Sequence, residues 1–312
     1  MRSLVWSLVV LVSTVWFGCA GRAPTRPMTV PEGQHVEVRG THLFVKRMGA
    51  GEPIVVVHGG PVLEHGYLMS HLLPLAASHE LVFYDQRLCG RSAPDVDPES
   101  VTLASFVDDI EALREALGLG RIHLMAHSFG GLLAMEYATR YPQHLRSLIL
   151  LDSMPPSSAM RQREDAVLAE QIRDDIREQM NAVRESEAFA RREVSAIAEL
   201  LRLSFASQFH DPAQLDRLEL TVPADYLHRS RQFAAMGPDL TEFDLTEGLR
   251  AVAAPTLVLY GEDEPAIAVG ETGWIDAMPS AELATIPAAG HFPFIEQPAA
   301  FLKRVRAFLG DV

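Results

Sequence analysis

Short apolar runs alternate with segments of helical spacing along most of the chain. The runs are rich in β-branched residues, as is typical of buried strands. They predict strands over 54–58, 81–84, 122–126, 148–151, 255–260 and 282–286, after a hairpin of 35–39 and 43–48 around Gly40. Apolar positions three or four residues apart predict helices over 103–117, 129–141, 269–278 and 298–309. Strands separated by helices imply an α/β fold, with a mostly parallel sheet covered by helices on both faces.

This alternation stops between residues 158 and 248, where the sequence predicts no strand. Leu168, Ile172, Ile176 and Met180 recur every four residues with charges between them. That spacing predicts one amphipathic helix that packs its apolar stripe against a core. We therefore predict one α/β domain, residues 35–152 and 250–312, interrupted by a helical cap over 153–249.

The N-terminus follows a different pattern. Arg2 precedes an apolar run over 4–17, which is shorter than the roughly 20 residues that span a bilayer. Such a segment is typical of a secretory signal, and Cys19 after Gly18 resembles a bacterial lipoprotein processing site. We predict a signal peptide over 1–19 with a lipidated Cys19, and a Pro-rich tether over 20–34. A signal peptide cleaved near Ala20 and an uncleaved anchor are the alternatives.

Composition narrows the classes of partner. The 312 residues include 41 acidic and 27 basic side chains, a net charge of −14, which argues against nucleic-acid binding. Two cysteines cannot form a disulfide scaffold, and Cys89 is the single thiol expected in the mature chain. No Cys/His pair has zinc-ligand spacing, so we expect neither a metal nor an organic cofactor. The expected partner is a small molecule or short peptide.

A serine stands at the turn between strand 122–126 and helix 129–141. Its neighbours two residues away, Ala126 and Gly130, are small enough to let a sharp turn close. This small-x-Ser-x-small turn is the nucleophile-elbow pattern, and the following helix N-terminus favours negative charge there. We predict Ser128 as a catalytic nucleophile.

Serine needs a base, and a base needs an orienting carboxylate. His291 lies between strand 282–286 and the last helix, so it is expected at the same sheet edge as Ser128. His58 ends a strand and is expected to be structural, and the side chain of His127 is expected to point away from the serine. Three acids, Glu262, Asp263 and Glu264, follow strand 255–260, and Asp152 after strand 148–151 is a further candidate.

A glycine-rich loop follows strand 54–58. It could supply the second backbone N–H of an oxyanion hole at Gly60, the first being that of Phe129 after the nucleophile. His58 and Gly59 would support this loop, and Asp85 and Arg87 could pair to brace it. A phosphate cradle is disfavoured, because no phosphate-loop spacing accompanies the glycines.

These motifs together resemble the α/β-hydrolase superfamily from about residue 35 to the end. They are His58-Gly-Gly-Pro61, Asp85-Gln-Arg87, Gly90-Arg-Ser92, Ser128 with its flanks, and Gly290-His291-Phe292, and they look like the proline iminopeptidase branch. The resemblance implies that the triad acid is Glu264, three residues after Gly261, with Asp263 next in order. Val62 and Leu88 stand where this branch usually has glycine, and Ala126-His127 where it often has Gly-Gly.

Members of this branch remove N-terminal residues, often proline, from peptides, and cap carboxylates bind the free amine. The resemblance therefore implies a serine aminopeptidase, and the N-terminal segment predicts that it is exported. The cap acids that could bind an amine are Glu164, Asp165, Asp174, Asp175, Glu185 and Glu187. The alternatives are a carboxylesterase or lactonase, which similar sequences include, and a non-catalytic binding lipoprotein that keeps the fold.

Overall fold

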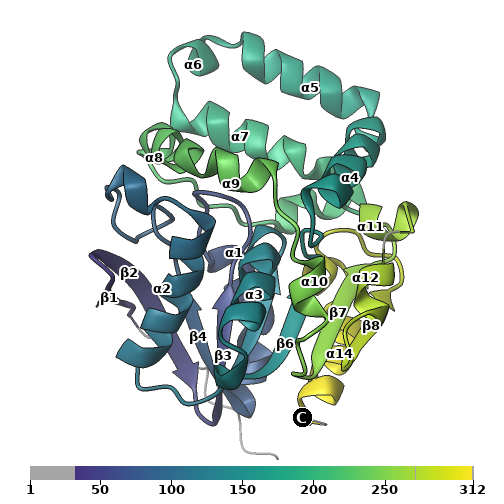
Figure 1. The fold of residues 1–312 in the computed structure, drawn as a ribbon. Helices are drawn as coiled ribbons and strands as arrows, with labels where there is room; N and C mark the ends of the chain where they lie inside the picture. The colour runs from purple at the N-terminus through teal and green to yellow at the C-terminus, as the bar shows by residue number, and fades with distance from the viewer. Residues whose placement is uncertain (1–31, 271, 311–312) are drawn as a thin grey trace, which may run out of the picture. The chain divides into compact units, whose positions relative to one another are not determined.

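The computed structural model describes residues 32–270 and 272–310 (Figure 1). The predicted signal peptide, Cys19 and most of the predicted tether lie outside these residues. Gln34, predicted as the last tether residue, instead begins the first strand and pairs with Val45. No helix within the described residues is long and apolar enough to cross a membrane.

An eight-stranded sheet forms the centre of this unit, in the order β1-β2-β4-β3-β5-β6-β7-β8. β1 and β2 form an antiparallel hairpin, β2 is antiparallel to β4, and the other pairs are parallel. The strands are β1 Gln34–Val38, β2 Thr41–Gly49, β3 Glu52–Val57, β4 His79–Tyr84, β5 Ile122–His127, β6 Leu145–Leu151, β7 Thr256–Gly261 and β8 Ala281–Ile286. Every predicted strand is confirmed, and so is the mostly parallel sheet.

Alternate residues of the central strands face opposite sides of the sheet. In β3, Val55 and Val57 belong to one core, and Ile54 and Val56 belong to the other. The helices that cover the first face are α2 Leu103–Ala116, α3 Phe129–Arg140 and α12 Gly273–Asp276. The helices that cover the second face are α1 Gly66–Leu72, α13 Pro293–Glu296 and α14 Pro298–Gly310. Because both faces are covered, the parallel strands can be apolar on both sides.

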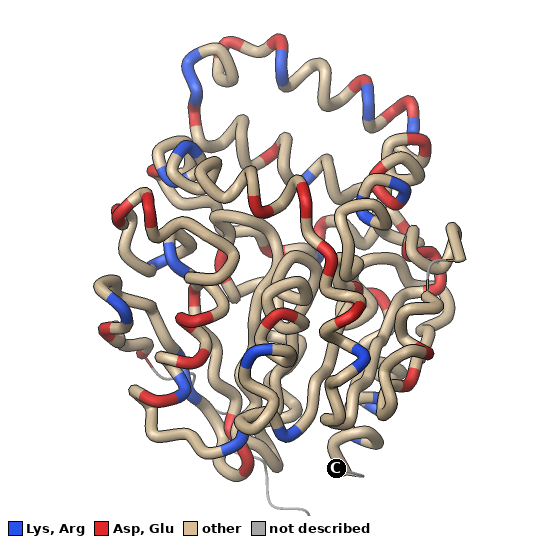
Figure 2. Tube along the Cα trace, viewed as in Figure 1, with Lys and Arg blue, Asp and Glu red and all other residues tan. Residues whose placement is uncertain are grey.

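Helices and turns fill the segment between β6 and β7. The α-helices are α4 Ser158–Gln171, α5 Asp174–Glu185, α6 Glu187–Ala190, α7 Val194–Ser204, α8 Tyr226–Phe233, α9 Gly237–Thr241 and α10 Thr246–Leu249. Figure 1 shows α4 to α9 grouped beyond one end of the strands, whereas α10 lies beside α3. Acidic and basic positions alternate along the outer helix α5 (Figure 2). Most of this segment therefore covers the sheet end, and α10 extends the core.

Two predicted helices were wrong in their extent. The stripe from Leu168 to Met180 is divided between α4 and α5, because the backbone of Ile172 and Arg173 is extended between them. Segment 269–278 forms only α12, after the short α11 Pro265–Ala268, since Gly270 has a φ of +68°. A left-handed residue ends a helix, and apolar spacing alone does not reveal it.

Candidate active site

Ser128 lies at a strained turn between β5 and α3. Its φ of 55° and ψ of −123° fall in a region that residues with a side chain rarely adopt. Small neighbours make the turn possible, because a Cβ on Gly130 would lie 2.6 Å from the carbonyl oxygens of Val57 and His58. Strand β5 thus runs into α3 while holding the serine side chain at the carboxyl end of the sheet.

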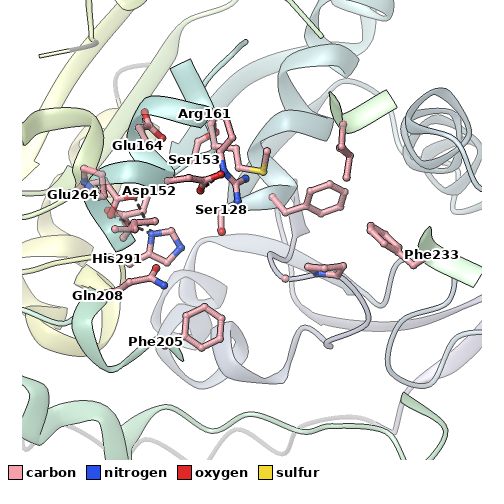
Figure 3. A pocket seen from close by; sticks show the side chains of 18 residues that line it. Ser128, Asp152, Ser153, Arg161, Glu164, Phe205, Gln208, Phe233, Glu264 and His291 are labelled. Atoms are coloured by element: carbon pink, nitrogen blue, oxygen red, sulfur yellow. Dashed lines mark hydrogen bonds and ion pairs between the residues drawn. The ribbon is translucent and has the colours of Figure 1, made fainter. Parts of the chain in front are cut away.

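His291 and Glu264 come together from two loops at the same sheet end. The His291 Nδ1 lies 3.1 Å and 3.2 Å from the two Glu264 carboxylate oxygens. Both side chains are largely buried, so this pair is shielded from water. Figure 3 shows the Ser128 side chain and the His291 ring in one pocket, with Glu264 on the side of the ring that faces away from Ser128.

The other candidate acids have different partners. Asp263 is half-exposed and accepts a hydrogen bond from His210 Nδ1 at 2.7 Å. The Asp152 Oδ1 accepts the Gly261 N–H at 2.7 Å, while its Oδ2 has no partner among the described residues. Burial, and then the nearby Glu264, raise the pKa of the Asp152 carboxyl well above its usual range. The surroundings of Asp152 thus favour its neutral form, and Glu264 is the carboxylate that contacts His291.

The loop after β3 lies directly against Ser128. A Cβ on Gly59 would stand 2.7 Å from the Ser128 Cβ, so only glycine lets the two segments approach this closely. Gly60 has a φ of +62° and lines the pocket together with Phe129. Neither the Gly60 N–H nor the Phe129 N–H has an acceptor among the described residues, so both are available to a substrate oxygen.

Two loop residues adopt a left-handed backbone without being glycine. Val62 has a φ of 66° and Leu88 a φ of 63°, and both side chains are buried. These are the positions where the sequence departs from the glycines of the family it resembles. Both positions therefore have the positive φ that glycine adopts without strain, and burial of the two side chains offsets strain of about 1–3 kcal/mol each.

His58 is held as a neutral structural residue. Its Nδ1–H donates to the Gly59 carbonyl oxygen at 2.8 Å, and its Nε2 accepts the Gln86 N–H at 3.1 Å. Burial lowers the pKa of His58 to about 4. Both ring nitrogens are occupied, so His58 supports the glycine loop and is not available as a base.

The predicted pairing of Asp85 with Arg87 is wrong. Asp85 contacts the His65 Nδ1 at 2.6 Å, whereas Arg87 forms a two-pronged ion pair with Asp109 of α2 at 2.7 Å and 2.6 Å. All four side chains are buried. Both residues still connect the loop after β4 to its surroundings, but through partners that only the tertiary fold supplies.

The pocket has a volume of about 400 Å³ and extends from the serine to the helices above it. The sequence did not indicate several of its lining side chains. They are Arg161 and Leu168 of α4, Phe205, Gln208, Phe233 and Leu240. Of the acids in the predicted cap, Glu164 and Asp165 line the pocket, and Asp165 accepts a hydrogen bond from Arg161 Nε at 2.6 Å. The pocket therefore has an apolar wall and a charged wall.

Cys89 and the side chains that could bind a metal are the remaining reactive groups considered in the sequence. Cys89 is fully buried, and burial raises the pKa of its thiol to about 12. It is therefore an unreactive core residue at neutral pH. Among residues 32–270 and 272–310, no group of three or more His, Cys, Asp or Glu side chains could hold a metal ion.

A serine that shares one pocket with a carboxylate-paired histidine, at the carboxyl end of a mostly parallel sheet, is typical of a serine hydrolase of the peptidase or esterase type. A family model of the alpha/beta hydrolase fold matches residues 52–298, and the chain belongs to this family.

Several known proteins are similar to this chain. A proline iminopeptidase from Heyndrickxia coagulans is 27% identical over 273 residues, which cover 85% of this chain and 92% of that protein. The solved structure of a proline iminopeptidase-related protein from Thermus thermophilus is 28% identical, covers 89% of this chain and 97% of its own, and has a TM-score of 0.67. An esterase from Thermogutta terrifontis shares the fold at 24% identity and a TM-score of 0.64, over 89% of this chain and 98% of its own. The predicted resemblance to the iminopeptidase branch is thus confirmed.

Replacing Arg87 by alanine tests the corrected pairing. The Arg87→Ala variant should lose about 3–5 kcal/mol of unfolding free energy, because it leaves Asp109 buried with only the part-exposed Arg39, 3.6 Å away, as a cationic partner. Arg191→Ala, which removes an exposed pair with Glu187, should stay close to wild type. Urea denaturation measures both variants, and equal losses would contradict the assigned role of the buried pair.

Proposed function

We propose that this hydrolase is an aminopeptidase of the proline iminopeptidase type, which releases N-terminal residues from small peptides through an acyl-enzyme. Similarity to the iminopeptidases described above supports the substrate class. The site itself supports the mechanism, because a serine, a paired histidine and two available N–H groups face one pocket.

In this mechanism the Ser128 Oγ attacks the carbonyl carbon of the scissile bond while His291 Nε2 takes the hydroxyl proton. Glu264 accepts the His291 Nδ1–H, which leaves Nε2 as the basic nitrogen, and it stabilises the imidazolium that forms. The N–H groups of Gly60 and Phe129 donate to the oxyanion of the tetrahedral intermediate.

His291 then returns the proton to the leaving amine, and the acyl group stays on Ser128. A water molecule attacks the acyl carbon with His291 again as the base, and the second tetrahedral intermediate collapses to release the acid. The proton goes back to the Ser128 oxygen, so the enzyme ends as it began.

Carboxylates in the pocket wall favour an aminopeptidase over an esterase, because they can bind a protonated amine. Glu164 is buried and lines the pocket, so its carboxylate can attract the protonated amine of a peptide N-terminus. Asp165 also lines the pocket, where it forms an ion pair with Arg161. The other cap acids considered, namely Asp174, Asp175, Glu185 and Glu187, are exposed on α5 and α6.

The alternative is a carboxylesterase or lactonase that acts on small esters. The apolar wall formed by Phe129, Phe205, Phe233 and Leu240 favours it, because such a wall suits an uncharged acyl chain. A non-catalytic binding lipoprotein is the remote alternative, and an intact set of Ser128, His291 and Glu264 argues against it.

Labelling with a fluorophosphonate and a paired substrate panel test the proposal. Wild type should be labelled and should cleave prolyl arylamides faster than short p-nitrophenyl esters. Ser128→Ala should show neither labelling nor turnover, since the nucleophile is gone. Ser78→Ala, on the exposed surface, is the matched control and should behave as wild type. Ester turnover without arylamide cleavage would favour the esterase, and an unlabelled wild type would contradict both enzymes.

Substitution of Glu164 tests the amine site. Glu164→Gln should lower kcat/KM for prolyl arylamides about ten- to hundredfold, because a charge-assisted hydrogen bond to the amine is weakened. Turnover of p-nitrophenyl acetate, which has no amine, should change by less than about twofold. The control is Asp174→Asn on exposed α5. An equal loss on both substrates would refute a role in amine binding.

We also propose that the protein is exported and anchored through a lipid on Cys19, at the outer face of a membrane or in the periplasm. The N-terminal sequence supports this location. In a bacterial host, Cys19→Ala should move the protein from the membrane fraction to the soluble fraction, while the buried Cys89→Ala control should stay with membranes. Retention of Cys19→Ala with residues 1–18 still attached would favour an uncleaved anchor instead.

A further inference from the structure

A buried chain of hydrogen bonds connects Gly59 through Tyr67 and His127 to His291, next to the candidate active site. The Gly59 N–H donates to the Tyr67 hydroxyl oxygen at 2.7 Å. This hydroxyl lies 2.7 Å from His127 Nδ1, and His127 Nε2 lies 3.0 Å from the His291 carbonyl oxygen. All three bonds are buried, so water does not compete for them.

The direction of each bond follows from counting protons. Because Gly59 donates to the Tyr67 oxygen, the single Tyr67 proton is free to point at His127 Nδ1. That nitrogen therefore accepts, and the His127 proton sits on Nε2, where it donates to the His291 carbonyl oxygen. Burial, and then the nearby His291, lower the pKa of His127 well below its usual range, which keeps this tautomer neutral.

The chain of bonds reaches three elements of the catalytic machinery. Gly59 precedes Gly60 of the proposed oxyanion hole, and His127 precedes Ser128. The His291 carbonyl oxygen accepts the hydrogen bond from His127 Nε2. The backbone N–H of His291 donates to the Gln208 carbonyl oxygen at 2.8 Å. The backbone of the catalytic base is thus fixed on both sides.

Packing makes this arrangement stiff. The His127 and His291 rings lie 4.8 Å apart between centroids, and Phe294 packs edge-on against His127 at 5.2 Å. A neutral His127 at this distance does not repel the imidazolium that His291 becomes during the reaction. A positively charged side chain in its place would oppose that step.

We propose that Tyr67 and His127 are positioning residues, which keep the oxyanion loop and the His291 base aligned with Ser128 through this chain of hydrogen bonds. The inference rests on the roles proposed above for Ser128, His291 and Gly60. A core histidine that served stability alone would have no effect on the chemical step, and this difference can be measured.

Two variants break the chain at different bonds. Tyr67→Phe removes the hydroxyl without changing shape, so kcat should fall about tenfold, while KM changes by less than about twofold. His127→Phe removes both contacts and should lower kcat about a hundredfold. His127→Gln keeps an N–H that can reach the His291 carbonyl oxygen, so it should recover a large part of that loss. The second-order rate of fluorophosphonate labelling should fall in the same order.

Two tyrosines away from the pocket provide matched controls. Tyr84 has a buried hydroxyl without a partner among the described residues, and Tyr137 donates to Glu111 Oε2 at 2.8 Å. Tyr84→Phe and Tyr137→Phe should leave kcat and labelling rates unchanged, even where Tyr137→Phe lowers the melting temperature. The second control separates lost stability from lost positioning.

The outcomes distinguish this inference from the proposed function. Labelling rates of Tyr67→Phe and His127→Phe equal to that of a labelled wild type would overturn the inference alone. A kcat loss in His127→Gln as large as in His127→Phe would also overturn it, because the Nε2–H contact would then not matter. An unlabelled wild type would overturn both this inference and the proposed function.

Discussion

The left-handed backbone of Ser128 is the constraint on which the rest of the site depends. It forces β5 to turn into α3 within one residue, and the turn closes only because Gly130 lets the α3 backbone meet the end of β3. The same closeness brings Gly59 against the serine, so the glycine loop and the nucleophile form one packed unit. Packing of the buried sheet around Ser128 offsets the strain of its backbone, which is why the turn persists. The N–H groups of Gly60 and Phe129 and the loop that carries His291 all lie around this turn.

Four carboxyl groups line the same pocket, and three of them, Asp152, Glu164 and Glu264, differ clearly in their surroundings. Glu264 contacts the imidazole of His291, which provides a donor for its charge. Asp152 is fully buried, and burial, followed by the nearby Glu264, raises the pKa of its carboxyl. Glu164 comes from α4 and lines the pocket. Carboxyl groups of one pocket thus differ in their expected chemistry, according to how deeply each is buried and which groups lie beside it.

The sequence predicted the elements that depend on local pattern. Strands with continuous apolar runs, the turn at Ser128 and the loop position of His291 follow from residue type and spacing, and the described fold agrees with them. Partners that come from distant segments could not be predicted in this way. Arg87 bonds to Asp109 of α2, and nothing in the motif around Arg87 points to that helix. The break between α4 and α5 was missed because the apolar spacing continues across it. His127 was expected only to point away from the serine, and its bonds to Tyr67 and to the His291 backbone depend on three segments that are far apart in the sequence.

Burial of Cys89 has a consequence for where this fold can exist. It is the single cysteine within the described residues, its side chain has no exposed surface, and its thiol stays protonated at any physiological pH. A protonated, enclosed sulfur neither exchanges with disulfides nor reacts readily with peroxide. Within the described residues, the fold therefore contains no disulfide that a change of redox potential could break. The same enzyme could fold in a reducing cytosol or in an oxidising exterior without the help of disulfide-forming catalysts.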